Sequence, residues 1–158
     1  MILPLAASVV WVDFFVILLS RFVSLSKSLD RWYSEFGIVA VLSDCLSAAI
    51  GTMIAMFVFP KGSLVTILIA SVVVQTIHDV LFYFGVIRPI SPGYNRMIDV
   101  FKAYAAENSW KIFIADSLIM IGTVLGMYAF SHADEMHQWF AFLTGVYALT
   151  YVIYTRPL

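Results

Sequence analysis

The sequence predicts an all-α integral membrane protein, a helix bundle that crosses the bilayer about five times. Of its 158 residues, 62% are hydrophobic and only 12% are charged, and the mean hydropathy is +0.95. A soluble domain of this length cannot bury so much apolar surface. The apolar residues also gather in long runs, and two amphipathic segments lie between these runs. We therefore interpret residues 1–158 as a single transmembrane domain.

The apolar runs are long enough to cross a hydrocarbon core of about 30 Å as helices. The first run lacks the positive region and the clear cleavage site of a secretory signal, so we expect it to be retained as a first span within residues 1–23. The breaker Pro60-Lys61-Gly62 predicts a tight hairpin between the second and third runs. The last run is short and is the weakest candidate. The expected spans are Pro4–Phe22, Gly37–Phe59, Ser63–Ile87, Ile112–Phe130 and Trp139–Tyr154.

Two longer segments between the spans, Ser24–Phe36 and Tyr94–Lys111, have apolar and aromatic residues at helical spacing. Such a stripe on an otherwise polar helix is typical of helices that lie in the membrane interface. Their remaining faces are then free for partner proteins. The residues expected to make these partner contacts are Arg31, Trp32, Glu35, Lys102, Tyr104 and Glu107.

The distribution of positive charge predicts the orientation, because Lys and Arg are retained on the cytosolic side during insertion. Of the nine Lys and Arg residues, eight fall in the expected inner loops and tail, and only Lys61 falls in an outer loop. This bias places the N-terminus outside and the C-terminus inside.

An internal repeat is visible in the second and fourth spans. Gly51–Phe59 and Gly122–Phe130 match at an offset of 71 residues. The match predicts two units of an interfacial helix and two spans, residues 24–87 and 94–154, related by rotation about the membrane normal. Duplication alone is more compatible with a larger bundle than with a transport pathway. Upstream, at an offset of 72, Trp32, Glu35 and Asp44 correspond to Tyr104, Glu107 and Asp116.

Four aspartates lie within expected spans, where no Lys or Arg lies well inside. An ionised carboxylate in hydrocarbon costs roughly 2.5–3.5 kcal/mol, so these side chains should face the bundle interior, a partner charge or water. One interpretation is a proton or cation site with His78 as a relay. The other is a structural polar layer whose carboxylates bond Lys111, Arg31 or hydroxyl groups. The residues of this layer are Asp13, Asp44, His78, Asp79 and Asp116.

Several classes of function are not indicated. The net charge of -1 and the absence of a basic run interleaved with aromatics argue against a nucleic-acid partner. The single cysteine, Cys45, excludes an internal disulfide and offers no zinc spacing. The sequence contains no Glu-x-x-His, His-Glu-x-x-His, Gly-x-Ser-x-Gly or glycine-rich phosphate loop. We therefore expect no enzyme activity, no metal and no cofactor.

Three stretches, Trp32–Asp44, His78–Phe84 and Asn95–Tyr104, carry a resemblance to known proteins. Through them the chain resembles small polytopic membrane proteins of large algal and amoebal DNA viruses, over about Leu29 to Phe130. The resemblance implies a virion protein in an inner membrane of host origin beneath an icosahedral capsid. It implies capsid or other membrane proteins as partners and a homo- or hetero-oligomer, and it brings no catalytic residues.

Two functions are therefore expected. The first is structural, in which the protein organises a virion membrane or links it to a capsid. The alternative is a small transporter or channel, coupled to protons or cations, that uses the aspartates within the membrane.

Overall fold

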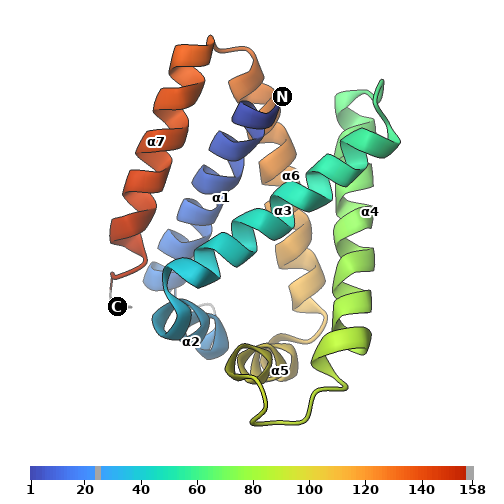
Figure 1. Ribbon diagram of the computed structural model, residues 1–158, viewed down its shortest axis with the longest axis vertical. Coiled ribbons are helices and arrows are strands. Elements are labelled where there is room, and N and C mark those ends of the chain that lie inside the picture. Colours follow the sequence, from blue (N-terminus) through green and yellow to red (C-terminus); the bar gives the residue numbers. More distant parts are fainter. Residues whose placement is uncertain (24–25, 156–158) are drawn as a thin grey trace.

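The computed structural model describes residues 1–23 and 26–155, and within them the chain forms only helices, turns and loops. Most of the long helices run roughly up and down the molecule, the helix of residues 38–58 crosses it obliquely, and the short helices lie across one end (Figure 1). In chain order the elements are α1 (Ile2–Val23), α2 (Lys27–Phe36), α3 (Ile38–Val58), α4 (Leu64–Phe82), the π-helix η1 (Tyr83–Ile87), α5 (Arg96–Asn108), α6 (Lys111–Ser131) and α7 (Glu135–Val152).

The all-helical class is confirmed, and four helices are long and apolar enough to cross a membrane: α1, α3, α4 continued by η1, and α6. They coincide with the first four expected spans. The fifth helix of this length, α7, forms where the last span was expected, but among the described residues it does not meet the same measure of length and hydropathy. Its first turn contains Glu135, His137 and Gln138, which lower its hydropathy. A crossing by α7 stays a prediction.

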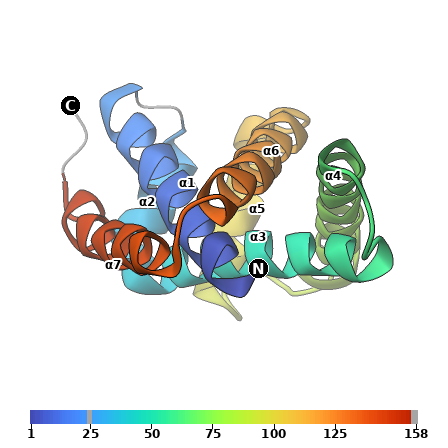
Figure 2. The ribbon, with the colours of Figure 1, turned by 90° about the horizontal axis from the view of Figure 1, so that it is seen from above.

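The first helix occupies the centre of one half of the bundle. α1 lies between α6 and α7 and packs against both (Figures 1 and 2). The other half consists of α3 and α4, which form the expected hairpin, and α4 also packs against α6. The repeat predicts equivalent hairpins, yet α1 separates the helices of the second hairpin.

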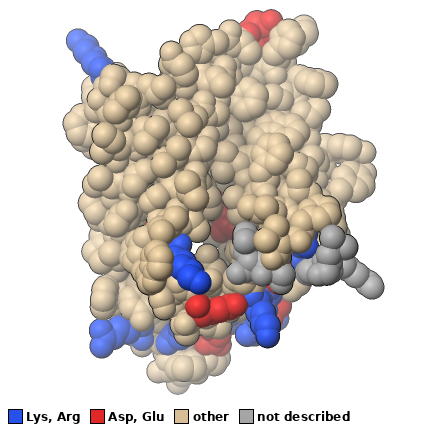
Figure 3. All heavy atoms as spheres, turned by 180° about the vertical axis from the view of Figure 1, so that it is seen from behind, with Lys and Arg blue, Asp and Glu red and all other residues tan. Residues whose placement is uncertain are grey.

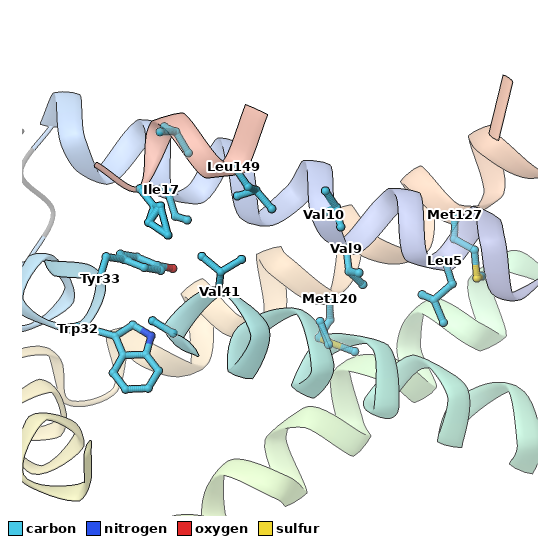
Figure 4. Packing of buried hydrophobic residues seen from close by; sticks show 14 of the residues in the cluster. Leu5, Val9, Val10, Ile17, Trp32, Tyr33, Val41, Met120, Met127 and Leu149 are labelled. Carbon is cyan, nitrogen blue, oxygen red and sulfur yellow. The ribbon is translucent and has the colours of Figure 1, made fainter. Parts of the chain in front are cut away.

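The close approach of α1 to its two neighbours depends on glycines. A Cβ atom at Gly126 of α6 would overlap Ser8 Oγ, and one at Gly145 of α7 would lie 2.7 Å from Val10 Cγ1. Polar contacts join the same surfaces, because Ser8 Oγ donates to the Thr123 carbonyl at 2.7 Å. Around these crossings lies the apolar core, drawn in part in Figure 4. Small residues thus allow α1 to pack closely between α6 and α7.

The two short helices α2 and α5 lie side by side at one end, as expected for interfacial helices (Figure 1). Each is joined to the following long helix by the same backbone conformation, with φ 50° and ψ -125° at Gly37 and φ 48° and ψ -126° at Ser109. In both joints the N–H group donates to the carbonyl four residues earlier, in Tyr33 and Ala105. The joints are 72 residues apart, the offset of the expected repeat. The repeat itself stays a prediction.

The outer surface of the long helices is apolar, and the charge gathers at one end. Figure 3 shows Lys and Arg around the end that carries α2 and α5, with one basic side chain at the opposite end. The sides of α3 and α4 expose large apolar residues to their surroundings, as lipid-facing helices do. Among them are Leu42, Leu46, Ile50, Phe57, Val65, Ile69, Val73 and Leu81.

Candidate functional site: an aspartate cluster

Four long helices each contribute one aspartate to the interior near the end covered by α2 and α5. Asp13 of α1 lies beside Asp44 of α3. Asp116 of α6 lies beside Asp79 of α4 and within electrostatic range of Asp44. The structure therefore brings together all four aspartates that the sequence placed in one layer, as two neighbouring pairs. We refer to these four residues as the aspartate cluster.

The interfacial helix α2 supplies hydrogen-bond donors to this cluster. Trp32 Nε1 donates to Asp44 Oδ2 at 3.1 Å, and the Tyr33 hydroxyl donates to the same oxygen at 3.0 Å. Both donor side chains are buried and point into the protein (Figure 4). Trp32 also packs on Phe101 of α5, with ring centroids 4.7 Å apart. Trp32, expected to contact a partner protein, instead lies inside this chain.

The second pair of carboxyl groups is formed by Asp79 and Asp116. Asp79 Oδ1 accepts from Gln75 Nε2 at 2.7 Å and lies 3.1 Å from His78 Nδ1, while Asp79 Oδ2 has no donor among the described residues. The Asp116 carboxyl group lies close enough to Asp79 for their charges to interact. Two carboxylates are acceptors only, so a bond between them forms when one is protonated. Asp79 and Asp116 therefore repel each other when both are ionised.

Asp13 is the most isolated member of the cluster. Its side chain is 6% exposed, and its Oδ2 atom has no hydrogen-bond donor among the described residues. Within residues 1–23 and 26–155, no Lys or Arg lies within 4.0 Å of any of the four carboxylates. Arg31, which the structural interpretation offered as a partner, instead pairs with Glu35. The four carboxyl groups thus lie close together without a Lys or Arg partner, so their negative charges repel one another when ionised.

Two tyrosines of the interfacial helices border the cluster. Burial raises the pKa of the Tyr104 hydroxyl, and the negative charges of Asp116 and Asp44 raise it further. Burial likewise raises the pKa of Tyr33, with added contributions from Asp44 and Asp13. Both hydroxyl groups therefore stay protonated at neutral pH and remain able to donate hydrogen bonds. Tyr104 therefore borders the aspartate cluster, whereas the sequence predicted that it contacts a partner protein.

Further polar side chains lie deeper in the bundle, and sequence reasoning did not find them. Ser71, Gln75 and Asp79 recur every fourth residue and so lie on one face of α4, about 6 Å apart along its axis. Ser71 is fully buried, and so are Thr52 of α3 and Thr123 of α6. The hydroxyl groups of these three residues have no hydrogen-bond partner among the described residues. In the sequence, this polar face is indicated by the four-residue spacing of Ser71, Gln75 and Asp79 in α4.

The other candidate contact residues connect segments of this chain. Glu107 of α5 accepts hydrogen bonds from the backbone N–H groups of Lys27 and Ser28, both at 2.9 Å, and so caps the first turn of α2. Lys102 donates to the Ile90 carbonyl. Glu35 of α2 pairs with Arg96 of α5 at 3.3 Å. These contacts hold α2 and α5 together as one charged surface.

The cap formed by Glu107 predicts a loss of stability at low pH. The hydrogen bonds from Ser28, Lys27 and Ser26 lower the pKa of the Glu107 carboxyl group from its ordinary value of 4.5 to about 2. Its stabilising effect is therefore complete above about pH 4.5 and is lost as the pH falls toward 2. Because the group is solvent-exposed, we expect this effect to stay below about 1 kcal/mol.

The measurement is thermal unfolding of the wild type and Glu107→Gln in detergent between about pH 6 and pH 2. The wild type should be more stable than the variant at pH 6, and the two melting temperatures should converge as the pH falls. A constant difference across this range would contradict the cap. Glu135→Gln is the control, because Glu135 is exposed and lies at the other end of the molecule.

Among the described residues, no group of three or more His, Cys, Asp or Glu side chains is arranged to hold a metal ion. Comparison of the chain with protein-family models, with curated proteins and with solved structures finds no match.

Proposed function

We propose that this protein moves protons through its membrane and that the aspartate cluster carries them. The observation behind the proposal is the set of four neighbouring carboxyl groups without a Lys or Arg partner among the described residues, in which the buried Asp13 Oδ2 is unbonded at 6% exposure. In hydrocarbon such groups take up protons in preference to remaining charged. A site that binds and releases protons at this depth is one end of a proton pathway.

The surroundings of the cluster suggest how protons enter and leave. His78 is about half exposed and lies 3.1 Å from Asp79, so it connects the outside of the bundle with the cluster. In the other direction, Gln75 and Ser71 continue the polar face of α4 away from Asp79. Buried hydroxyl groups without protein partners are sites where water binds. We therefore propose a path from His78 through Asp79 and Asp116 toward Ser71.

The test is proton flux into liposomes that contain the purified protein, driven by a potassium diffusion potential and read by an enclosed pH-sensitive dye. The wild type should acidify or alkalinise the lumen according to the sign of the potential. Asp79→Asn and Asp116→Asn should each reduce the flux to the level of protein-free liposomes, because both residues lie on the proposed path and the amide does not take up a proton at neutral pH.

Asp134→Asn is the matched control. Asp134 is exposed and caps the first turn of α7, and asparagine is an equally good cap. Its flux should equal that of the wild type. Normal flux in all three variants would overturn the proposal. So would wild-type flux of sodium or potassium ions without any movement of protons.

A second candidate function is structural, as the resemblance implies. The observation in its favour is the charged surface of α2 and α5, in which the Arg31 and Arg96 side chains are 51% and 78% exposed. We propose as the alternative that this surface contacts capsid proteins beneath a virion membrane. Quantitative mass spectrometry of virus particles tests it: many copies retained with capsid proteins after mild detergent would support it, and absence from particles would reject it.

A further inference from the structure

A pocket opens where η1, which continues α4, meets the interfacial helix α5, away from the aspartate cluster. It has a volume of about 240 Å³ and is lined by Tyr83, Ile87, Arg88, Lys102, Ala105 and Ala106. The first three residues come from η1 and the turn after it, and the last three come from α5. The lining contains two positive charges and no negative one.

The two cations of the pocket have no acidic partner. Neither Arg88 nor Lys102 forms an ion pair within the part of the chain that the structure describes. Lys102 donates one hydrogen bond to the Ile90 carbonyl, which leaves two of its three donors free. The Arg88 guanidinium lies over the Phe84 ring at 5.8 Å from its centroid, a contact that leaves its N–H groups available.

Local backbone structure brings these side chains to the pocket. The π-helix closes with a hydrogen bond of 2.8 Å from the Arg88 N–H group to the Tyr83 carbonyl, five residues earlier. A π turn contains one residue more than an α turn, so it shifts Arg88 out of the register of α4. On the facing helix, Ala105 and Ala106 have small side chains, which leave the space between α5 and η1 open.

The depth of the pocket indicates what it binds. The apolar stretch Leu64–Ile87 ends at the pocket, and Arg88 follows directly. The pocket thus lies at the boundary between hydrocarbon and water, where lipid phosphates are located. It also lies at the end of the molecule that carries most of the basic residues (Figure 3). Basic pockets between helices at this level bind anionic lipid head groups.

We propose that Arg88 and Lys102 form a binding site for a phosphate group, that of an anionic phospholipid, with the Tyr83 hydroxyl as a third donor. The guanidinium group offers two parallel N–H donors to phosphate oxygens, and the ammonium group adds a point charge. The acyl chains of the bound lipid would then extend along the exposed apolar surface of α4, where Leu81 and Ile77 lie. Neither the aspartate cluster nor its protonation enters this binding.

Native mass spectrometry of the protein released from mixed bilayers of phosphatidylglycerol and phosphatidylcholine tests the site. The wild type should retain phosphatidylglycerol in preference to phosphatidylcholine. At about 1 kcal/mol for each positive charge, R88Q/K102Q should bind phosphatidylglycerol about 30-fold more weakly. Lys27→Gln is the matched control, since Lys27 is exposed at the same end of the molecule and lies outside the pocket.

Two further experiments separate the effect of the pocket from that of charge, and the lipid from free phosphate. Ala106→Leu fills the pocket without a change of charge and should cause a similar loss of phosphatidylglycerol. Added inorganic phosphate that displaces the lipid would identify a site for free phosphate as well, and failure to displace it would identify a site specific for the lipid. Equal phosphatidylglycerol retention by the wild type, R88Q/K102Q and Ala106→Leu would overturn the proposal.

Discussion

Gly126→Leu is expected to destabilise the folded protein by about 3 kcal/mol, because it forces α1 away from α6. Even the first added carbon would overlap Ser8 Oγ and would lie 3.3 Å from Ser8 Cβ. The side chain of Ser8 can turn away only by giving up its hydrogen bond to the Thr123 carbonyl. α1 is also in contact with α7, so the displacement disturbs both of its interfaces.

The measurement is unfolding of the purified protein in mixed micelles by titration with a denaturing detergent. Gly85→Leu is the control, because no atom lies within 4 Å of a Cβ at Gly85, and it should unfold like the wild type. Gly126→Ala should be destabilised less than Gly126→Leu. Ser8→Gly combined with Gly126→Ala should recover stability relative to Gly126→Ala alone. If the double variant is as unstable as the sum of the single variants, the Ser8 contact is not the cause.

The positions of the helices could be predicted from the sequence, because the length of an apolar run is set by the thickness of the bilayer. Which helices pack against each other could not be predicted. A glycine such as Gly126 permits close helix packing, but nothing in an apolar run indicates which helix packs on it. The repeat suggested that α6 and α7 would pair as α3 and α4 do. Instead α1 lies between them, with Ser8 against Gly126 and Val10 against Gly145.

The candidate site was predicted in part for a similar reason. An ionised carboxylate inside a span costs free energy when it faces hydrocarbon, so the sequence alone indicated that Asp44 and Asp116 would face the interior. The donors to Asp44 were missed, because Trp32 was expected to contact a partner protein. Tryptophan and tyrosine have an apolar ring and a single polar group, so they fit an exposed contact surface and a buried hydrogen bond equally well.

Asp44→Leu is expected to destabilise the protein by about 3 kcal/mol, with the effect concentrated in α2. The substitution leaves Trp32 Nε1 and the Tyr33 hydroxyl as two buried donors without their acceptor, and each such donor costs about 1–3 kcal/mol. The removal of a buried carboxyl group offsets part of that cost. Asp44→Asn keeps one acceptor oxygen at nearly the same place, so it should cost about 1 kcal/mol.

Hydrogen exchange of the α2 backbone amides measures this loss of stability in α2 itself. Exchange in α2 should accelerate in Asp44→Leu, while exchange in the first turns of α7, at the opposite end of the molecule from α2, should change little (Figure 1). A second substitution separates lost acceptors from lost packing. Tyr33→Phe removes one of the two unpaired donors, so Asp44→Leu with Tyr33→Phe should exchange more slowly than Asp44→Leu alone. If the second substitution makes α2 exchange faster still, the hydroxyl group of Tyr33 has another partner and Asp44 is not what holds α2 in place.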